Sequence, residues 1–406
     1  MEKMAFDLYS SEYQNNPYPT LAYYREHEPV HPFIISQGEY QRQAWLITRY
    51  QDVITLLKDE KVTKDVINIL KSDGEQTQEQ QKELDLIVNN MLFKDPPDHS
   101  RLRTLVHKVF TPKMITGLQN RIEQISSELI EEMKNKTDVD LIEDYAVPLP
   151  VTVISEMMGI AEEDRHQFRV WSNAITNISN GDNAPKFQES IKQFIRYLEK
   201  IIEKRKKNPS DDIISGLIIA EENGDMLSHK ELLSMLFLLI VAGHETTVNL
   251  IGNGMLALLQ HRDQLEKLKD HPEYMKTAIE EFLRFTNPVE FATSRYAVED
   301  FIFRDQEIKK GDFIFLGLAA ANRDPDQFIN PNKLDITRNP NKHLAFGNGI
   351  HFCLGAPLAR LEGQVAFQQL IQNFPDITLR SDIEIKWRHS EIFRGLESLP
   401  IILWKF

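Results

Sequence analysis

Cysteine is almost absent from this sequence, because Cys353 is the only one among 406 residues. A single thiol excludes intramolecular disulfides, a zinc site made of several cysteines and a cysteine-ligated iron–sulfur cluster. Positive charge is also in deficit: 47 lysines and arginines stand against 61 aspartates and glutamates, which gives a net charge of −14. A general nucleic-acid binder needs a basic face to neutralise phosphates, so this balance disfavours that class.

Long hydrophobic runs and targeting signals are missing as well. Residues 1–20 lack a charged stretch followed by an apolar one, so no signal peptide is expected. The most apolar stretch, LLSMLFLLIVAG at 232–243, is too short to cross a bilayer and predicts a buried helix. We therefore expect a cytoplasmic protein that makes no membrane contact. Nothing is typical of a linker, and residues 1–406 are expected to form a single domain.

The hydrophobic pattern predicts a mainly α protein with small β-sheets. Apolar residues recur at spacings of three and four along 116–135, which is typical of a helix. A long helix is expected to begin at Ser228, because Ser228 and Glu231 have capping-box spacing, and to end near Gln260. Residues 295–318 alternate and contain a KKGD turn, which predicts a small sheet. An irregular segment then leads to the cysteine and to a last helix that begins APLARLE.

The cysteine lies in FGNGIHFCLG, residues 346–355, directly before that last helix. By itself a lone cysteine is most often a small buried hydrophobe. A zinc site would need more ligands than His351 and Cys353, and a dinucleotide fingerprint fails because Phe352 takes the place of its third glycine. A catalytic cysteine with a distant histidine stays open. The first-turn amides of the helix would stabilise a thiolate, and the glycines would let the loop approach a flat ligand closely.

This decapeptide resembles the haem-binding loop of the cytochromes P450, whose pattern is Phe-Gly-x-Gly-x-His-x-Cys-x-Gly. The chain matches each fixed position, at Phe346, Gly347, Gly349, His351, Cys353 and Gly355. The resemblance implies the cytochrome P450 fold, with haem b (iron protoporphyrin IX) between a long central helix and the cysteine loop. It also implies that Cys353 is the thiolate ligand of the iron and that Phe346 and Gly347 contact the cofactor.

A second match is AGHETT, within the long apolar helix. Taken alone, this stretch could be a polar interruption of a buried helix. A zinc-protease motif is excluded because its second histidine would fall on Val248. The family holds an acid–alcohol pair at this place, so the resemblance assigns proton delivery to Glu245 and Thr246. It assigns a groove for dioxygen to Ala242 and Gly243.

Two sets of charged residues match the family pattern too. Glu281 and Arg284 occupy its Glu-x-x-Arg positions, and Arg338 matches the third member of that structural ion network. An i,i+3 pair alone is usually a surface contact. The cations that the resemblance assigns to the haem propionates are His99, Arg103, Arg295 and His351.

The resemblance also suggests where substrate binds. The residues that would line the pocket are Leu238, Val241, Ala242, Val289, Phe291, Ala292 and Phe393. This lining is apolar, which predicts an apolar ligand, although each residue alone is more often plain core. Residues 65–93 would cover the pocket and are polar enough to be mobile.

The activity implied is monooxygenation, in which one atom of O2 enters a C–H bond and the other becomes water. Because the chain has no GxGxxG stretch, electrons are expected from a separate ferredoxin or flavodoxin with its NAD(P)H-dependent reductase. Within the family, the sequence resembles Bacillus-type enzymes that tailor polyketides and macrolides. This favours a bulky substrate that is polyketide- or macrolide-like, terpenoid or steroid-like, or fatty-acyl, either free or carrier-bound. We expect a monomer.

Other classes remain possible at this stage. A haem-binding sensor or carrier would need the cysteine loop but has no use for Glu245 and Thr246. A P450-fold isomerase or dehydratase has no clear use for this pair either. The pair therefore favours an oxygenase.

Overall fold

The computed structural model describes residues 6–37, 40–65, 85–176, 184–222 and 224–404. These residues are mostly helical with small sheets, which confirms the expected class. The chain divides into two compact units. The first unit comprises Met1–Thr63, Glu123–Pro148 and Thr246–Phe406, and the second comprises Lys64–Ile122 and Leu149–Glu245.

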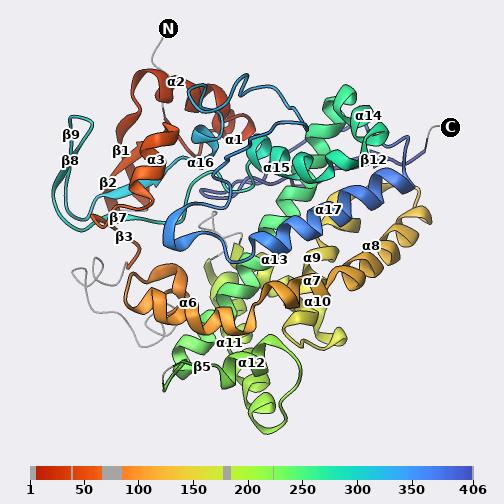
Figure 1. The fold of residues 1–406 in the computed structure, drawn as a ribbon, viewed down its shortest axis with the longest axis horizontal. Coiled ribbons are helices and arrows are strands. Elements are labelled where there is room, and N and C mark those ends of the chain that lie inside the picture. Colours follow the sequence, from red (N-terminus) through yellow and green to blue (C-terminus); the bar gives the residue numbers. More distant parts are fainter. Residues whose placement is uncertain (1–5, 38–39, 66–84, 177–183, 223, 405–406) are drawn as a thin grey trace. The chain divides into compact units, whose positions relative to one another are not determined.

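Helices and strands are numbered in the order of the chain and are labelled in Figure 1. The helices of the first unit are α1 (Ser11–Asn15), α2 (Tyr18–His27), α3 (Tyr50–Leu56), η2 (Ile142–Ala146), α14 (Arg262–Asp270), η5 (Pro272–Tyr274), α15 (Met275–Thr286), α16 (Leu318–Ala321), η6 (Gly349–His351) and α17 (Ala356–Asn373). Its strands are β1 (Val30–Gln37), β2 (Tyr40–Ile47), β3 (Val62–Thr63), β4 (Val139–Asp140), β7 (Tyr296–Ala297), β8 (Phe301–Phe303), β9 (Gln306–Ile308), β10 (Phe313–Leu316), β11 (Thr378–Leu379) and β12 (Pro400–Ile402).

The second unit contains η1 (Met91–Phe93), α6 (Asp98–Val109), α7 (Pro112–Gly117), η3 (Glu162–Asp164), α10 (Arg165–Thr176), α11 (Ala184–Lys207), α12 (Ile213–Ile219), β5 (Glu221–Glu222) and β6 (Asp225–Met226). Three helices cross the boundaries between the units: α8 (Gln119–Lys134), α9 (Pro148–Met157) and α13 (His229–Gln260).

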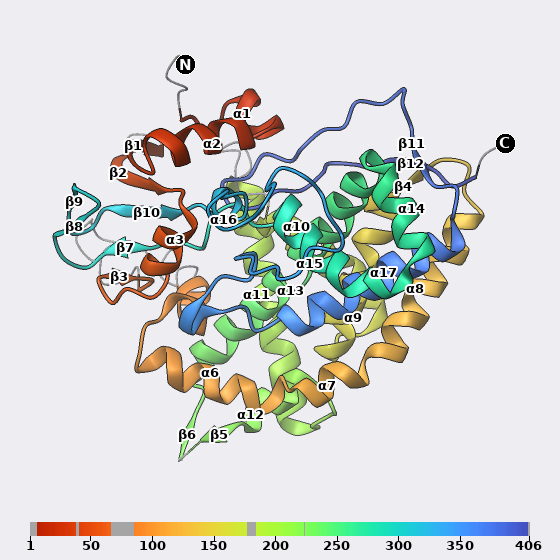
Figure 2. The ribbon, with the colours of Figure 1, turned by 45° about the horizontal axis from the view of Figure 1, so that its top comes forward.

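The largest sheet joins two distant segments of the sequence within the first unit. Its strand order is β1-β2-β10-β7-β3, so β10, from the second half of the sequence, lies parallel to β2 (Figure 2). A second sheet pairs β4 with β12 and β11. The strands between residues 295 and 318 confirm the predicted sheet, and Gly311 in its KKGD turn has a φ of 88°, which a glycine adopts without strain.

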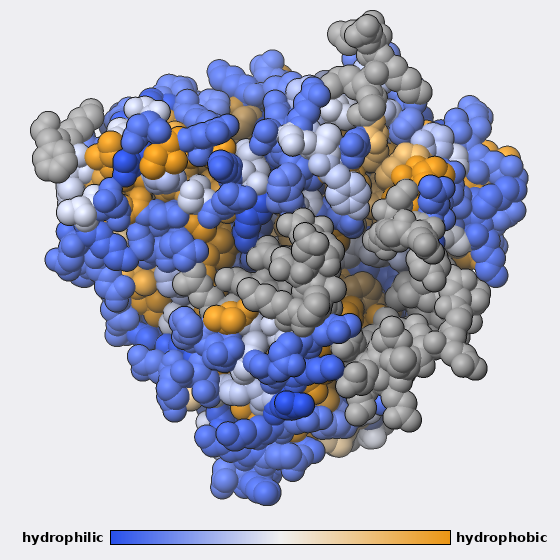
Figure 3. Space-filling model, turned by 180° about the vertical axis from the view of Figure 1, so that it is seen from behind, coloured by the Kyte–Doolittle hydropathy of each residue, from blue (hydrophilic) through white to orange (hydrophobic). Residues whose placement is uncertain are grey.

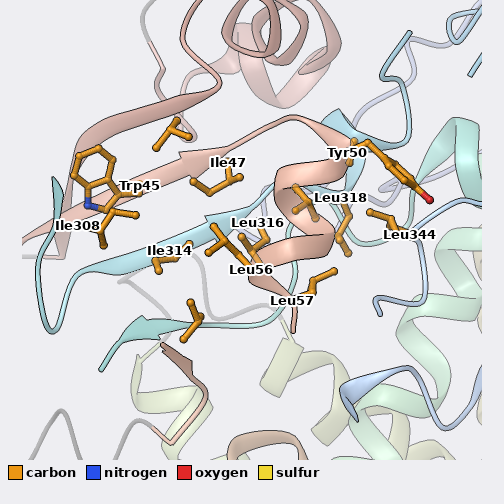
Figure 4. Packing of buried hydrophobic residues seen from close by; sticks show 14 of the residues in the cluster. Trp45, Ile47, Tyr50, Leu56, Leu57, Ile308, Ile314, Leu316, Leu318 and Leu344 are labelled. Carbon is orange, nitrogen blue, oxygen red and sulfur yellow. The ribbon is translucent and has the colours of Figure 1, made fainter. Parts of the chain in front are cut away.

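The alternation of side chains along these strands builds a core on each face of the large sheet. On one face, Trp45 and Ile47 pack with Ile314 and Leu316 under α3 (Figure 4). On the other face, Ala44, Leu46 and Phe315 pack with residues from α1 and α2, among them Tyr13 and Tyr24. The two amino-terminal helices therefore pack as a layer on one face of the sheet in the first unit.

Helices α13, α15 and α17 pack closely behind the cysteine loop. The Phe282 and Phe367 ring centroids lie 4.6 Å apart. A Cβ at Gly254 of α13 would lie 2.7 Å from the Phe367 ring, so only glycine fits at this contact. The carboxyl-terminal part of α13 is thereby fixed against the helix that follows Cys353.

The capping box predicted for α13 is confirmed atom by atom. The Ser228 amide donates to a Glu231 carboxylate oxygen at 2.8 Å, and the Glu231 amide donates to the Ser228 hydroxyl at 3.3 Å. Glu231 also binds Arg101 of α6, within the second unit. This helix begins and ends within one residue of the prediction.

Helix α13 is the one helix, among the described residues, that is long and apolar enough to cross a membrane. In its most apolar window, 67% of the residues are buried inside the protein, as is usual for a core helix. Large apolar side chains that are exposed elsewhere include Ile302 and Ile329, and Figure 3 shows one face on which hydrophilic side chains prevail between smaller hydrophobic areas.

Candidate functional site

The loop at residues 346–355 is held in one conformation by its own backbone. The Cys353 amide donates to the Phe346 carbonyl at 3.0 Å, and the Gly347 amide donates to the Leu344 carbonyl at 2.8 Å. Gly347 and Gly349 have φ values of 69° and 77°, in the left-handed region that other residues rarely adopt. These glycines therefore set the path of the loop.

The thiol of Cys353 is exposed, and the neighbouring Phe352 is 40% exposed. This is unlike the buried small hydrophobe that a lone cysteine most often is. Gly355 is the N-cap of α17, so the sulfur lies beside the amino-terminal turn of an 18-residue helix, where the helix dipole favours a thiolate. Among the described residues, no cluster of three or more metal-ligating side chains accompanies it.

Phe346 is held from α17 and α15 by a network that the sequence did not indicate. The Arg360 guanidinium lies 4.6 Å from the Phe346 ring centroid. It donates to both carboxylate oxygens of Glu280, at 2.6 and 2.8 Å, and His343 contacts the same carboxylate at 3.0 Å. Burial disfavours the charge on Glu280, but the bonds from Arg360 and His343 outweigh it and lower its pKa to about 2.

The predicted ion network lies beside this one, and its members Glu281 and Arg284 are fully buried. Glu281 receives two bonds from Arg284, at 2.7 and 2.8 Å, and one from Arg338 at 3.1 Å. Arg284 also donates to the carbonyls of Asn322 and Pro331, which lie in the irregular segment before the cysteine loop. The structure thus brings all three predicted residues together and ties them to that segment.

One stripe of the central helix is left open. Leu238 and Thr246 are half-buried and Ala242 is exposed, whereas most of their neighbours in α13 are buried. These positions are four residues apart and therefore share one face of the helix. Gly243 packs against Ile154, where a Cβ would lie 3.1 Å from the isoleucine methyl, and Glu245 is buried.

His99 and Arg103 lie on α6, one turn apart, in the second unit. His99 is buried, which lowers its pKa, and the charges of Arg103 and Lys64 lower it further. Lys64 is itself a buried cation that sequence reasoning missed. Arg103 and Lys64 concentrate positive charge beside His99, which would favour an anionic ligand.

The other two predicted propionate ligands lie in the first unit. Arg295 is buried, just before β7, and donates to the Thr293 carbonyl at 2.8 Å. His351 is half-buried in η6, two residues before the thiol.

The predicted pocket residues of the first unit lie on two paired segments. Val289 pairs with Phe393 in an antiparallel bridge, and both side chains are half-buried, as is Ala292. Phe291 differs, because it is fully buried with its ring 5.4 Å from that of Phe315. Its side chain belongs to the core below the sheet. Val241 of α13 is half-buried, and residues 66–84 of the expected cover lie outside the described residues.

Comparison with known proteins gives consistent matches. Residues 138–386 match the profile of the cytochrome P450 family. The polyketide biosynthesis cytochrome P450 PksS of Bacillus subtilis (strain 168) is 49% identical over 406 residues, which are the whole of both chains. Its solved structure, named for the bacillaene polyketide synthase, has a TM-score of 0.91 and covers 99% of this chain and 100% of its own.

A second solved structure is similar at lower identity. It is P450BioI in complex with an acyl carrier protein ligated to hexadec-9Z-enoic acid. It is 37% identical, has a TM-score of 0.88, and covers 97% of this chain and 99% of its own. Both structures share the fold over nearly the full length.

Proposed function

The chain belongs to the cytochrome P450 family, and from that premise we propose that Cys353 would hold its haem through a bond from the thiolate to the iron. Members of this family are haem b monooxygenases, and so is this protein. When bound, haem b supplies the iron centre at which dioxygen is activated. The observation that carries the assignment is the exposed thiol of Cys353, on a loop fixed by two left-handed glycines.

The residues around the proposed site fit this cofactor. An exposed thiol beside a helix amino terminus suits a thiolate ligand, and the Cys353 amide is already bonded within the loop. Phe346 and Gly347 would contact the macrocycle from the loop. The residues that the family pattern assigns to the propionates are His99, Arg103, Arg295 and His351, and arginine is suited to bidentate contacts with a carboxylate.

Glu245 and Thr246 are the proposed proton pathway. Oxygen activation needs protons that arrive one at a time, and the Glu245 carboxyl can pass a proton to the Thr246 hydroxyl oxygen. The half-buried position of Thr246 and the exposed position of Ala242, on one face of α13, support this assignment. A haem sensor or carrier would not need this pair. We therefore favour an enzyme that oxygenates a substrate over a protein that only binds haem.

The proposed substrate is a long, largely apolar polyketide-like or fatty-acyl chain. The proposed lining, formed by Leu238, Val241, Ala242, Val289, Ala292 and Phe393, is apolar throughout. A relative that is 49% identical is named for polyketide biosynthesis, and one similar structure holds a fatty acid ligated to a carrier protein. Macrolide-like, terpenoid and steroid-like molecules are the other bulky, largely apolar ligands that such a lining would suit.

The proposed electron donor is a ferredoxin or flavodoxin with its NAD(P)H-dependent reductase. Bacterial members of the family take electrons from redox partners. Exposed Lys113 is a candidate contact for an acidic donor. Arg101 is already engaged with Glu231, which makes it a poorer candidate.

The test is turnover by the purified holoprotein with a surrogate ferredoxin, its reductase, NADPH and O2. The ligand panel is a long-chain fatty acid, a macrolide and a steroid. We expect NADPH consumption coupled to a product that is heavier by one oxygen atom. In Thr246→Ala, consumption should continue while product falls by at least about tenfold, because the hydroxyl that carries the proton is lost.

Thr246→Ser is the matched control, since it keeps the hydroxyl and should keep the coupling. Full coupling in Thr246→Ala would overturn the proton pathway. Haem binding without oxygenated product from any member of the panel would overturn the proposed substrate class.

A further inference from the structure

A buried ion pair lies behind the two segments that carry Val289 and Phe393. The Glu290 amide donates to the Ile392 carbonyl at 2.7 Å, and the Arg394 amide donates to the Pro288 carbonyl at 3.0 Å. Val289 and Phe393 are directly opposite each other in this pairing, so their side chains share one face. Glu290 and Arg394, one residue further along, point to the opposite face, and both are buried.

Arg394 is held at both terminal nitrogens and at one face of its guanidinium. Its two terminal nitrogens donate to the carbonyls of Gln14 and Asn15, each at 2.9 Å, at the end of α1. Its guanidinium carbon lies 3.7 Å from the centroid of the Trp387 ring. A planar, forked cation can make these three contacts together, and an ammonium group cannot.

Glu290 is the charge partner of this arginine. One carboxylate oxygen lies 3.6 Å from a terminal nitrogen of Arg394, which is an ion pair without a hydrogen bond. The hydroxyl of Tyr13, on α1, is buried nearby and, within the described part of the chain, makes no hydrogen bond of good geometry. The pair is therefore held by packing and charge rather than by a closed bond network.

The same segment is attached to the central helix. Asn253 of α13 donates to the Arg394 carbonyl at 2.7 Å, and Arg388 donates to Asn249 of α13 at 2.7 Å. A Cβ at Gly395 would lie 2.1 Å from the Asn249 oxygen, so the backbone lies directly on the helix. Phe393 is thus positioned between an anchor at α1 and an anchor at α13.

We propose that Arg394 and Glu290 are positioning residues for substrate, which set the location of Phe393 and Val289 and so determine which ligand shapes the protein accepts. The inference rests on the proposed function, because it assumes that these two apolar side chains face the substrate. Neither charged residue touches substrate. They act through the paired segments between them and the ligand.

The electrostatics of the pair make this positioning dependent on pH. Burial raises the pKa of Glu290 to about 7, against the opposing charge of Arg394. The other groups around the pair are Tyr13, whose pKa is raised well above its usual value, and Arg323, which lies over Tyr18. Near neutral pH, Glu290 is therefore the group that titrates. Below about pH 7 it is protonated, and Arg394 loses its charge partner.

The experiment measures dissociation constants from the spin-state shift that a ligand causes in the holoprotein. The two probes are a long-chain fatty acid and a steroid, and the quantity of interest is the ratio of their constants from pH 6 to pH 8. In the wild type we expect the ratio to change about threefold or more across this range. Glu290→Gln should give a ratio that is independent of pH and equal to the wild-type value at pH 6. Arg394→Lys should shift the ratio at every pH.

Matched controls are Glu307→Gln on β9 and Arg380→Lys after β11, which make the same chemical changes at exposed ion pairs. Both should behave as the wild type. A purely structural role would weaken both probes equally and leave the ratio and its pH profile unchanged, and that result would overturn the inference. If neither probe shifts the wild-type spectrum, the fatty-acyl and steroid-like parts of the proposed substrate class fail instead, and macrolide binding then decides the inference. A dissociation constant that depends on pH in the wild type and not in Glu290→Gln would support it, and equal pH profiles would overturn it.

Discussion

Glu362, two residues after Arg360 in α17, is a carboxyl group in an apolar setting. It is buried, and among the described residues neither of its oxygens forms a hydrogen bond of good geometry, although Thr247 lies close. Burial raises its pKa from 4.5 to about 8, which the Thr247 hydroxyl only partly offsets. The folded protein therefore holds a proton here over a pH range in which the unfolded chain has lost it.

This difference predicts how stability depends on pH. Between about pH 5 and pH 8 the folded state binds more protons at Glu362, so the free energy of unfolding falls as the pH rises, by up to about 1.4 kcal/mol per pH unit. Glu362→Gln cannot ionise and should lack this contribution. Thermal unfolding midpoints at pH 6 and pH 8 test this contribution. The midpoint of the wild type should fall further between these two pH values than the midpoint of the variant. Exposed Glu397→Gln is the control, and equal losses in the wild type and in Glu362→Gln would contradict the assignment.

At the residue scale, sequence reasoning located the cysteine loop and the charged trio, because short motifs carry them. It missed Glu280, Glu290 and Arg394. Glu280 binds Arg360, which is 80 positions away, and Arg394 binds Gln14, which is 380 positions away. No local sequence pattern predicts a partner at such a separation, because only the fold brings the two side chains together.

Glu280 of α15 binds Arg360 of α17. From this contact we predict the rate at which haem is lost from the cysteine loop, residues 346–355. Glu280→Gln removes the charge that fixes Arg360 and, through it, the ring of Phe346. We expect haem to be lost to an acceptor protein several-fold faster than from the wild type, because charge-assisted bidentate bonds are replaced by weaker ones.

The control for this variant is Glu266→Gln on α14, which breaks exposed pairs with Arg262 and Lys269 and should leave haem loss unchanged. The lowered pKa of Glu280 also predicts how the stability of this network depends on pH. The stabilising charge of Glu280 is present above pH 4.5 and is lost as the pH falls toward 2. Haem loss in Glu280→Gln at the wild-type rate would contradict the role of the network.

Element boundaries were predictable where the signal is local. The beginning of α13 follows from its capping box, and β10 and its turn follow from alternation and a glycine. Strand pairing was not predictable, because β10 lies parallel to β2, almost 270 residues earlier, and the register depends on how both faces of the sheet are buried. The burial of Phe291 beside Phe315 could not be predicted for the same reason, because the pairing of a segment decides which face each of its side chains takes.

On the scale of the whole molecule, the chain has two compact units, and α13 is the longest of the three helices that have residues in both. The first unit contains the cysteine loop, the ion networks and the paired segments, and the second contains the open stripe of α13 before Thr246 and the cations on α6. The resemblance of short motifs to one family, together with full-length similarity at 49% identity, makes oxygen insertion the activity to explain.

The most direct test of this account is the difference spectrum of the reduced holoprotein with carbon monoxide. Because the chain has one cysteine, no other thiol can replace Cys353 as a ligand. We predict that the wild type shows the long-wavelength Soret band typical of thiolate ligation and that Cys353→Ser, still loaded with haem, loses it. A wild-type band at the shorter wavelength of imidazole ligation, or an unchanged band in Cys353→Ser, would contradict it.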